Sequence, residues 1–478
     1  MIPESLSGKT VLVLGAGKSG RAAARLAAFH GAHAILVDGA AKDSAPEDSA
    51  QLSEAGVSFL WGCHDCLWAG DEKIDLVVVS PGIPLGSALH RMGESTGAPL
   101  VGELEFGASF LTCPILAVTG TNGKTTTTEL LTACLKGAGF SALSAGNIGV
   151  PLSQIALDPP ALDYLVLEVS SFQLEHAASL RPAGAILLNV TPDHLDRHGS
   201  LENYTVLKAS LLERVPASGA VVYHAALEEH LHLADGVHRA RLWLRGEEPT
   251  ALAERPQAED WWICAEGIRH LTPSGEELVL SRAGLQMQGS HNLANAAAVI
   301  AMLSALGIPL DKYRLALSNF QCGPHRIQLV RERNEVLFVD DSKATDVDAM
   351  IQALRTLGPM AGKGIHLIAG GLAKGCSLVE AEPEIRMYVK TAFLIGESGP
   401  RLAESWGNWT QCHVCASLEE AVALAANAAS PRELVLLSPG CASMDMFRSY
   451  AERGDKFAAA VDALDSHACA RTGAGEPS

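Results

Sequence analysis

A glycine-rich turn followed by a lysine and a threonine is the stretch of this chain whose residue types most clearly point to chemistry. The segment AVTGTNGKTTTTE joins an apolar run, which predicts a buried strand, to a Thr-rich run, which predicts a helix. Gly120 and Gly123 would let backbone N–H groups approach phosphate oxygens. Lys124 would then supply a cation to the β- and γ-phosphates, and Thr125 a hydroxyl to Mg²⁺. Val118 stands where the usual pattern has a glycine, so the segment predicts a variant P-loop, the alternative being a Gly/Thr-rich turn with an exposed lysine.

Polar residues also follow the next two apolar runs, YLVLE and GAILLNV. Ligands collect at the carboxyl ends of strands in an open α/β sheet, so we expect Glu168, Asp193 and His194 next to Lys124. Glu168 and His194 could bind Mg²⁺ directly, because a cation that bridges phosphates borrows only one or two protein ligands. Lys208 lies on a helical stretch that follows them.

The N-terminal run KTVLVLGAGKSGRAAARLAAFHGAHAILVDG predicts a strand, a Gly-rich turn, a helix and a second strand ending at Asp38. Its GxGxxG spacing would seat a pyrophosphate on a helix N-terminus, and taken alone it suggests NAD. A further run, IDLVVVSPGIP, ends in a turn where Ser80 and Gly82 could meet the same ligand.

The last third of the chain alternates apolar strands with helical stretches, which predicts another mostly parallel sheet. Arg326, Lys343 and Lys374 all fall in loops after strands. Positive loops of this kind suggest closure over an anionic intermediate at the nucleotide site.

These patterns predict an α/β protein of three domains, with an N-terminal Rossmann-like domain, a central P-loop ATPase-like domain with a mostly parallel sheet, and a C-terminal Rossmann-like domain. We place the domains at residues 1–102, 103–321 and 322–465, with a disordered tail at 466–478. The strand-like pieces of 223–288 are assigned loosely, as a peripheral extension of the central domain.

Bulk properties exclude several classes of protein. A formal net charge of −18 argues against nucleic acid as a partner. The sequence has no apolar run long enough to span a membrane and no basic-then-apolar leader, so we expect a cytoplasmic protein. Among the 11 cysteines, the CHDC and CHVC motifs resemble halves of a zinc site. Neither has a second pair of ligands near it, so the sequence favours isolated surface thiols.

Several motifs, taken together and in order, resemble the Mur ligases: GTNGKTT, LEVSSFQLE, NVTPDHLDRHG, HNLANA, HRIQ, DDSKAT, GGLAKG and LLSPGCASMDMFRSYAERGDKF. The last four look like the family member that adds glutamate. The resemblance runs from about residue 9 to residue 460 and is far more specific than any single motif.

The resemblance implies an ATP-dependent amide ligase with Mg²⁺, two ions, as cofactor. The γ-phosphate of ATP would pass to the carboxylate of UDP-N-acetylmuramoyl-L-alanine, and the amine of D-glutamate would attack the resulting acyl phosphate. Such a reaction needs charge neutralisation more than a general base, which agrees with the lysines and metal ligands above. The handedness of the glutamate is left open, and a monomer is the default expectation.

The resemblance also assigns residues to sites. The expected ATP-binding residues are Gly120, Thr121, Asn122, Gly123, Lys124, Thr125, Thr126, Asn292, Asn295, Arg326 and Asp341. Those expected at the metals are Thr125, Glu168, His194 and Lys208, the last as a carbamate. The UDP-substrate would meet Gly17, Lys18, Ser19, Asp38, Ser80, Gly82 and Asn147. Glutamate would meet Lys343, Thr345, Lys374, Ser443 and Tyr450. The expected catalytic set is Lys124, Glu168, His194, Lys208 and Lys343.

Several of these residues have plainer interpretations. Without the resemblance, Lys208 would be a solvated helix lysine, Asp341 a cap after a strand, and Asn292 and Asn295 a helix cap and a surface amide. Tyr450 stands where the family commonly has Phe and would contribute its backbone N–H.

Two alternative functions remain. A sibling ligase could add another residue, as folylpolyglutamate synthase and the ligases for L-alanine or a diamino acid do; the diamino acid ligase usually carries DNPR where this chain has DDSKAT. An oxidoreductase or non-catalytic role built on GxGxxG leaves Lys124, Glu168 and His194 unexplained.

Overall fold

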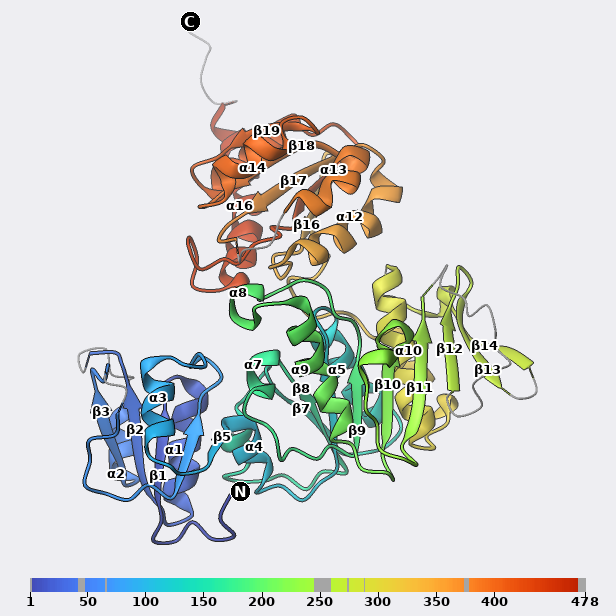
Figure 1. Cartoon of the computed structure of the whole chain (residues 1–478). Coiled ribbons are helices and arrows are strands. Elements are labelled where there is room, and N and C mark those ends of the chain that lie inside the picture. The colour runs from blue at the N-terminus through green and yellow to red at the C-terminus, as the bar shows by residue number, and fades with distance from the viewer. Residues whose placement is uncertain are drawn as a thin grey trace, which may run out of the picture. The chain divides into compact units, whose positions relative to one another are not determined.

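The structure, a computed structural model, describes residues 2–41, 48–64, 67–244, 259–272, 275–287, 289–373 and 378–471. These residues form three β-sheets flanked by helices, which confirms the predicted α/β class (Figure 1). The chain forms two compact units. The first comprises Met1–Val190, Glu202–Gln286 and Leu293–Phe320, and the second Thr191–Leu201, Met287–Asn292 and Gln321–Ser478. The domain boundaries near residues 102 and 321 stay predictions.

The N-terminal sheet is fully parallel in the strand order β3-β2-β1-β4-β5, as a Rossmann-like domain requires. Its strands are β1 (Thr10–Leu14), β2 (His33–Asp38), β3 (Val57–Trp61), β4 (Leu76–Val79) and β5 (Leu100–Gly102). Its helices are α1 (Lys18–Phe29), α2 (Ser49–Glu54) and α3 (Ala88–Ser95). The order of the strands reverses between β1 and β4, where a crevice for a ligand is expected.

The central sheet has the order β14-β13-β12-β11-β10-β9-β6-β8-β7. Its strands are β6 (Ile115–Thr119), β7 (Ala142–Gly146), β8 (Tyr164–Glu168), β9 (Gly184–Leu187), β10 (Ala220–His224), β11 (His238–Trp243), β12 (Glu259–Ile263), β13 (Gly267–Thr272) and β14 (Gly275–Ser281). Its α-helices are α4 (Glu103–Ala108), α5 (Lys124–Gly137), α6 (Leu152–Ile155), α7 (Ser171–Leu174), α9 (Leu201–Glu213), α10 (Ser290–Ala305) and α11 (Arg314–Asn319). Short 3₁₀ helices, η2 (Ala225–His230), η3 (Arg282–Gly284) and η4 (Leu310–Lys312), complete it.

The segment that the sequence placed only loosely, 223–288, turns out to extend this sheet at one edge. Strand β11 pairs parallel with β10 and β12, and β13 and β14 then pair antiparallel. The central sheet is therefore one continuous layer (Figure 1).

The C-terminal sheet has the order β15-β16-β20-β17-β18-β19, with β15 antiparallel to β16 and the other pairs parallel. Its strands are β15 (Gln328–Arg333), β16 (Val336–Asp340), β17 (Ile365–Gly370), β18 (Val389–Ile395), β19 (Gln411–Val414) and β20 (Leu434–Leu437). Its helices are α12 (Val347–Ala361), η5 (Leu378–Ala381), α13 (Glu382–Tyr388), α14 (Gly399–Trp406), α15 (Leu418–Ala428) and α16 (Tyr450–Arg471). The second unit also holds the short helix α8 (Leu195–His198).

Continuous apolar runs form the inner strands because helices cover both faces of a parallel sheet. Every residue of β6 is buried, and Leu116 of β6 and Leu165 of the neighbouring strand β8 are fully so. Each such side chain contributes about 1.5–3 kcal/mol by leaving water. The inner strands thus hold their carboxyl-terminal loops on a rigid base.

Two expectations are corrected by the structure. Residues 466–471 continue helix α16 where the sequence predicts disorder, and residues 472–478 lie outside the described part of the chain. In the CHVC motif, Cys415 is buried in one core cluster and the half-buried Cys412 packs against another, where the sequence predicts isolated surface thiols. Its partner motif CHDC falls partly outside the described residues, at Cys66.

Candidate functional site

The predicted P-loop lies between β6 and α5, and its local structure explains its residues. Gly123 begins the helix with a positive φ of 83°. A Cβ atom there would lie 2.4 Å from Oδ1 of Asn295, so only glycine fits both the turn and the neighbouring helix α10. The strand, the turn and the helix that the sequence predicted are therefore confirmed, and Asn295 is buried against the loop.

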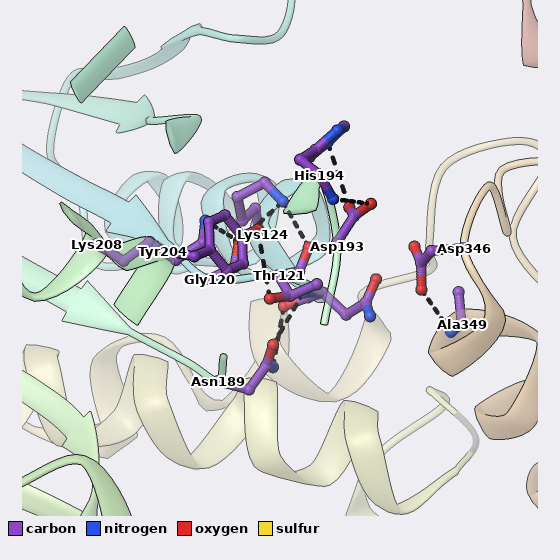
Figure 2. A network of polar contacts seen from close by, with 11 residues as sticks. Gly120, Thr121, Lys124, Asn189, Asp193, His194, Tyr204, Lys208, Asp346 and Ala349 are labelled. Atoms are coloured by element: carbon purple, nitrogen blue, oxygen red, sulfur yellow. Dashed lines mark hydrogen bonds and ion pairs between the residues drawn. The ribbon is translucent and has the colours of Figure 1, made fainter. Parts of the chain in front are cut away.

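Two lysines converge on one carbonyl oxygen of this loop (Figure 2). Lys124 Nζ donates hydrogen bonds to the carbonyl oxygens of Gly120, at 3.0 Å, and Thr121, at 2.6 Å. Lys208 Nζ donates to the same oxygen of Gly120 at 2.8 Å. Lys208 is only 1% exposed, so the plain interpretation of a solvated helix lysine is wrong.

Tyr204, which the sequence analysis did not single out, supports this arrangement from the same helix, α9. Its ring lies under the Lys208 ammonium, 4.6 Å from Nζ to the ring centroid. Its hydroxyl is 3.5 Å from Oγ1 of Thr121. The four-residue spacing of Tyr204 and Lys208 on a helix was the available signal.

Asn189 is a second residue that the sequence analysis missed. Its backbone oxygen accepts from the N–H of Thr121 at 3.0 Å. Its side chain binds the backbone of Asn122 twice, accepting at 2.9 Å and donating at 3.1 Å (Figure 2). A polar residue two positions after the end of the buried strand β9 was the signal, because β9 neighbours β6 in the sheet.

Glu168 ends β8, the other neighbour of β6, and is 2% exposed. Its Oε1 accepts a hydrogen bond from Nδ2 of Asn147 at 2.8 Å. Among the described residues its Oε2 has no hydrogen-bond partner although the atom is buried. A buried carboxylate oxygen without a partner is costly, and a cation would remove that cost.

The residues near the P-loop fit a divalent cation that also binds phosphates. Thr125 and Thr126 are buried at the start of α5. Within the described ranges no three His, Cys, Asp or Glu residues form a closed metal site. A hard cation of the Mg²⁺ type needs only one or two protein oxygens when phosphate supplies others, and Glu168 Oε2 and Thr125 could serve.

In the N-terminal domain the structure joins the Gly-rich turn to Asp38 and Ser80. Asp38 accepts hydrogen bonds from the N–H groups of Ala16, at 2.6 Å, and Ala40, at 2.8 Å, and Ser80 Oγ donates to the carbonyl oxygen of Gly15 at 3.1 Å. A Cβ atom on Gly20 would lie 1.8 Å from that oxygen. The other predicted contacts of the UDP-substrate are exposed or half-buried: Gly17, Lys18, Ser19, Gly82 and Asn147.

His194 belongs to the second unit, in the segment Thr191–Leu201, so its predicted part in a metal site with Glu168 stays a prediction. It adopts a left-handed backbone at φ 53°. Its N–H donates to Asp193 Oδ1 at 2.9 Å, and its Nε2 is 3.3 Å from Oδ2 of the same residue. A buried carboxylate thus holds the imidazole.

The loops after three strands of the C-terminal sheet are bonded to one another. Gly440 N–H donates to Ala344 at 3.0 Å, and Leu372 and Ala442 form a β-bridge. These bonds bring together the loops that carry Lys343, Thr345 and the buried Ser443. Lys343 Nζ lies 5.2 Å from the ring centroid of Tyr450. The predicted glutamate contact Lys374 lies outside the described residues.

Asp341 is buried after β16, and its carboxylate is held inside the protein. It accepts from Ser438 Oγ at 2.8 Å and from the N–H of Ile327 at 3.2 Å. Burial raises the pKa of Asp341 to about 7, against the lowering effect of these hydrogen bonds and of Arg326. These contacts tie Asp341 to two other loops of the same unit, and both the cap after the strand and the ribose contact stay predictions.

Arg326 also faces a histidine of the same unit. Burial, and after it the Arg326 guanidinium, lowers the pKa of His291 to about 4. His291 is therefore neutral at pH 7. The neighbouring Asn292 is buried.

Two protein-family models match the sequence of this chain. The Mur ligase middle domain matches residues 118–303. The Mur ligase, glutamate ligase domain matches residues 325–441. These ranges contain the P-loop and the bonded loops of the C-terminal sheet.

Curated relatives resemble the chain over almost its whole length. A UDP-N-acetylmuramoylalanine–D-glutamate ligase from Pelotomaculum thermopropionicum is 38% identical over 453 residues, which is 94% of this chain and 96% of that protein. A ligase of the same name from Trichlorobacter lovleyi is 36% identical over 95% of this chain and 99% of that protein.

Solved structures share the fold at lower identity. A UDP-N-acetylmuramate–alanine ligase from Thermotoga maritima has a TM-score of 0.58 at 19% identity, covering 96% of this chain and 99% of that chain. A MurF ligase from Thermotoga maritima in complex with ADP has a TM-score of 0.57 at 17% identity, covering 98% and 100%. Among the described residues no helix is long and apolar enough to cross a membrane.

Proposed function

Because this chain belongs to the Mur ligase family, we propose that it joins D-glutamate to UDP-N-acetylmuramoyl-L-alanine at the expense of ATP, a step of peptidoglycan precursor synthesis. The single observation that carries the proposal is the convergence of Lys124 and Lys208 on the Gly120 carbonyl, within a P-loop whose sheet neighbour ends in Glu168. A lysine ammonium and a buried carboxylate at a phosphate loop suit the transfer of a phosphoryl group, with Lys208 close enough to serve the same site.

The P-loop binds the phosphates of ATP. Lys124 exchanges its two carbonyl acceptors for oxygens of the β- and γ-phosphates, and the N–H groups at the start of α5 bind the same anion. Glu168 Oε2 and Thr125 would hold Mg²⁺, with His194 and a carbamate on Lys208 as further proposed ligands. When bound, Mg²⁺ neutralises charge on the transferring phosphoryl group.

The chemistry then has two steps. A carboxylate oxygen of the alanyl residue attacks the γ-phosphorus, and ADP leaves with the electrons of the broken P–O bond. The glutamate amine, having lost a proton, attacks the acyl carbon of the acyl phosphate. The tetrahedral intermediate expels inorganic phosphate and leaves an amide bond.

Loops of the C-terminal sheet are proposed to hold glutamate. A dicarboxylate needs at least two cationic or hydroxyl contacts, which Lys343, Lys374, Thr345 and Ser443 offer. The mutual bonding of the loops after β16, β17 and β20 supports a shared site for three of these four residues. Tyr450 packs its ring near Lys343 and so would help to orient that ammonium.

The UDP end of the substrate is proposed to lie at the switch point of the N-terminal sheet. The Gly-rich turn, Asp38 and Ser80 form a bonded cluster there, beside the N-terminus of α1. A nucleotide-linked substrate and ATP as co-substrate make the cytoplasm the proposed compartment, and we propose that the protein acts as a monomer.

Phosphate release from ATP tests the proposal directly. Purified protein is supplied with UDP-N-acetylmuramoyl-L-alanine, Mg²⁺ and either D-glutamate, L-glutamate or a diamino acid. Release that depends on D-glutamate is expected. Release with another acceptor would favour a sibling ligase, and release unaffected by Lys124→Ala would remove the P-loop from the mechanism.

A further inference from the structure

Asn147 contacts the carboxylate that the proposed reaction places at the metal. The family resemblance assigns Asn147 to the UDP-substrate, yet its side-chain amide donates a hydrogen bond to Glu168. Building on the proposed function, we propose that Asn147 is a positioning residue that orients Glu168 for Mg²⁺. The argument starts from the backbone of the two neighbouring strands.

The register of β7 and β8 puts Asn147 beside Glu168. Gly146, the last residue of β7, pairs with Glu168, the last residue of β8. Asn147 N–H then donates to the carbonyl oxygen of Glu168 at 2.9 Å. Asn147 therefore meets Glu168 through its main chain as well as its side chain.

Gly146 makes this close approach possible. Its φ is 98°, and a Cβ atom would lie 2.3 Å from the Glu168 carbonyl oxygen. Only glycine fits at such a separation. The chain thus turns tightly after β7 and leaves the Asn147 side chain beside the Glu168 carboxylate.

The side-chain hydrogen bond from Asn147 makes the two carboxylate oxygens of Glu168 different. Nδ2 of Asn147 donates to Oε1 at 2.8 Å, whereas Oε2 is buried and has no partner among the described residues. An ionised carboxylate only accepts hydrogen bonds, so the amide must present its NH₂ group. With Oε1 held, the carboxyl plane has one fixed orientation and Oε2 is left for a cation.

The exposure of the two residues agrees with a supporting role. Glu168 is buried, while Asn147 is exposed. The remaining amide oxygen of Asn147 therefore stays accessible to a substrate, and the residue can serve both partners. Hydrogen-bond partners of metal-ligating carboxylates commonly change metal affinity about 10–100-fold when removed.

Binding of Mn²⁺ in the presence of ADP tests the inference without turnover. The affinity is measured by electron paramagnetic resonance on the full-length protein and on Asn147→Ala. We expect Asn147→Ala to bind Mn²⁺ about 10-fold more weakly and to need more Mg²⁺ for half-maximal ligation. Asn427→Ala, an exposed asparagine on α15, is the matched control and should bind like the wild type.

A double-mutant cycle isolates the pathway through Glu168. In the Glu168→Gln background, Asn147→Ala should cause no further loss of Mn²⁺ affinity, because the group that Asn147 orients is already changed. Far-ultraviolet circular dichroism checks folding. If Asn147→Ala fails to fold, Asn147→Leu, which keeps the branching at Cγ and removes the donor, takes its place.

The outcomes separate this inference from the proposed function. Unchanged Mn²⁺ affinity in Asn147→Ala together with a raised KM for the UDP-substrate would overturn the positioning role and leave a substrate contact. A wild-type protein that binds Mn²⁺ with ADP but joins no glutamate would overturn the proposed function alone. Equal losses of Mn²⁺ affinity in both backgrounds would also overturn the inference.

Discussion

Lys124 and Lys208 donate hydrogen bonds to the same oxygen, the carbonyl of Gly120, from helices α5 and α9. Lys208 is buried, whereas Lys124 is half-buried at the start of α5. An incoming polyphosphate would supply Lys124 with stronger acceptors than these carbonyl oxygens. The loop is therefore a candidate anion-binding site.

Removing Lys124 should weaken nucleotide binding. In Lys124→Ala the loop loses the cation that reaches the β- and γ-phosphates, and we expect ADP affinity to fall at least 10-fold. Calorimetric titration with Mg·ADP measures the loss. Lys136→Ala, an exposed lysine of the last turn of α5, serves as the control, and an equal loss there would contradict the assignment.

Lys208→Ala should abolish ligation while leaving the fold in place. If Lys208 carries a carbamate, short-chain carboxylic acids added to the assay should partly restore phosphate release, because they replace the missing carboxylate. The assay is phosphate release with and without added acetate. Activity near that of the wild type, without rescue, would remove the carbamate from the mechanism.

Gly20→Ala should damage the N-terminal domain. Its added methyl group would lie 1.8 Å from the Gly15 carbonyl oxygen. The backbone would have to shift to avoid this clash, which destabilises the fold by about 1–3 kcal/mol. We expect a lower free energy of unfolding in urea and weaker binding of UDP. Gly17→Ala is the matched control for folding, because its Cβ atom would meet no heavy atom within 4 Å.

Substitutions in the loops of the C-terminal sheet should affect glutamate selectively. In Lys374→Ala and Ser443→Ala the KM for D-glutamate should rise at least 10-fold while the KM for ATP stays near that of the wild type. Steady-state kinetics with each substrate varied in turn provides both constants. Equal increases in the two constants would place these residues elsewhere.

A half-exposed ion pair at the other end of the C-terminal sheet predicts a pH dependence of stability. Glu433 accepts from Lys390 Nζ at 2.5 Å and lies 2.9 Å from His366 Nε2. Burial by itself would raise the pKa of Glu433, but hydrogen bonds from Lys390, His366 and Ser430 lower it to about 2.

The sign follows from the lowered pKa of the folded state. The ionised Glu433 stabilises the fold at every pH above about 4.5, the ordinary value, and this contribution is lost as the pH falls towards 2. We expect Glu433→Gln to lower the free energy of unfolding by about 2 kcal/mol at pH 7. The difference from the wild type should shrink below pH 4.5 in urea titrations, and a constant difference would contradict the ion-pair account.

Much of the fold follows from the sequence alone. Runs such as ILAVT and YLVLE are apolar up to their last residue, which suits strands covered on both faces. The turns between strands carry glycine where the backbone needs a positive φ, as at Gly123. The chemistry of the P-loop follows likewise, because Lys124 and Thr125 stand next to the turn that positions them. Such local signals need no knowledge of the rest of the chain.

Tertiary structure decided which distant residues meet. Strand order places β8 and β9 on either side of β6, and only this order brings Glu168 and Asn189 to the loop, since neither is close to it in sequence. Burial of Lys208 depends on how α9 packs, which the local pattern of charges does not reveal. The bond between Asn147 and Glu168 depends on the register of β7 against β8, because a slip of one residue would turn the side chains to opposite faces.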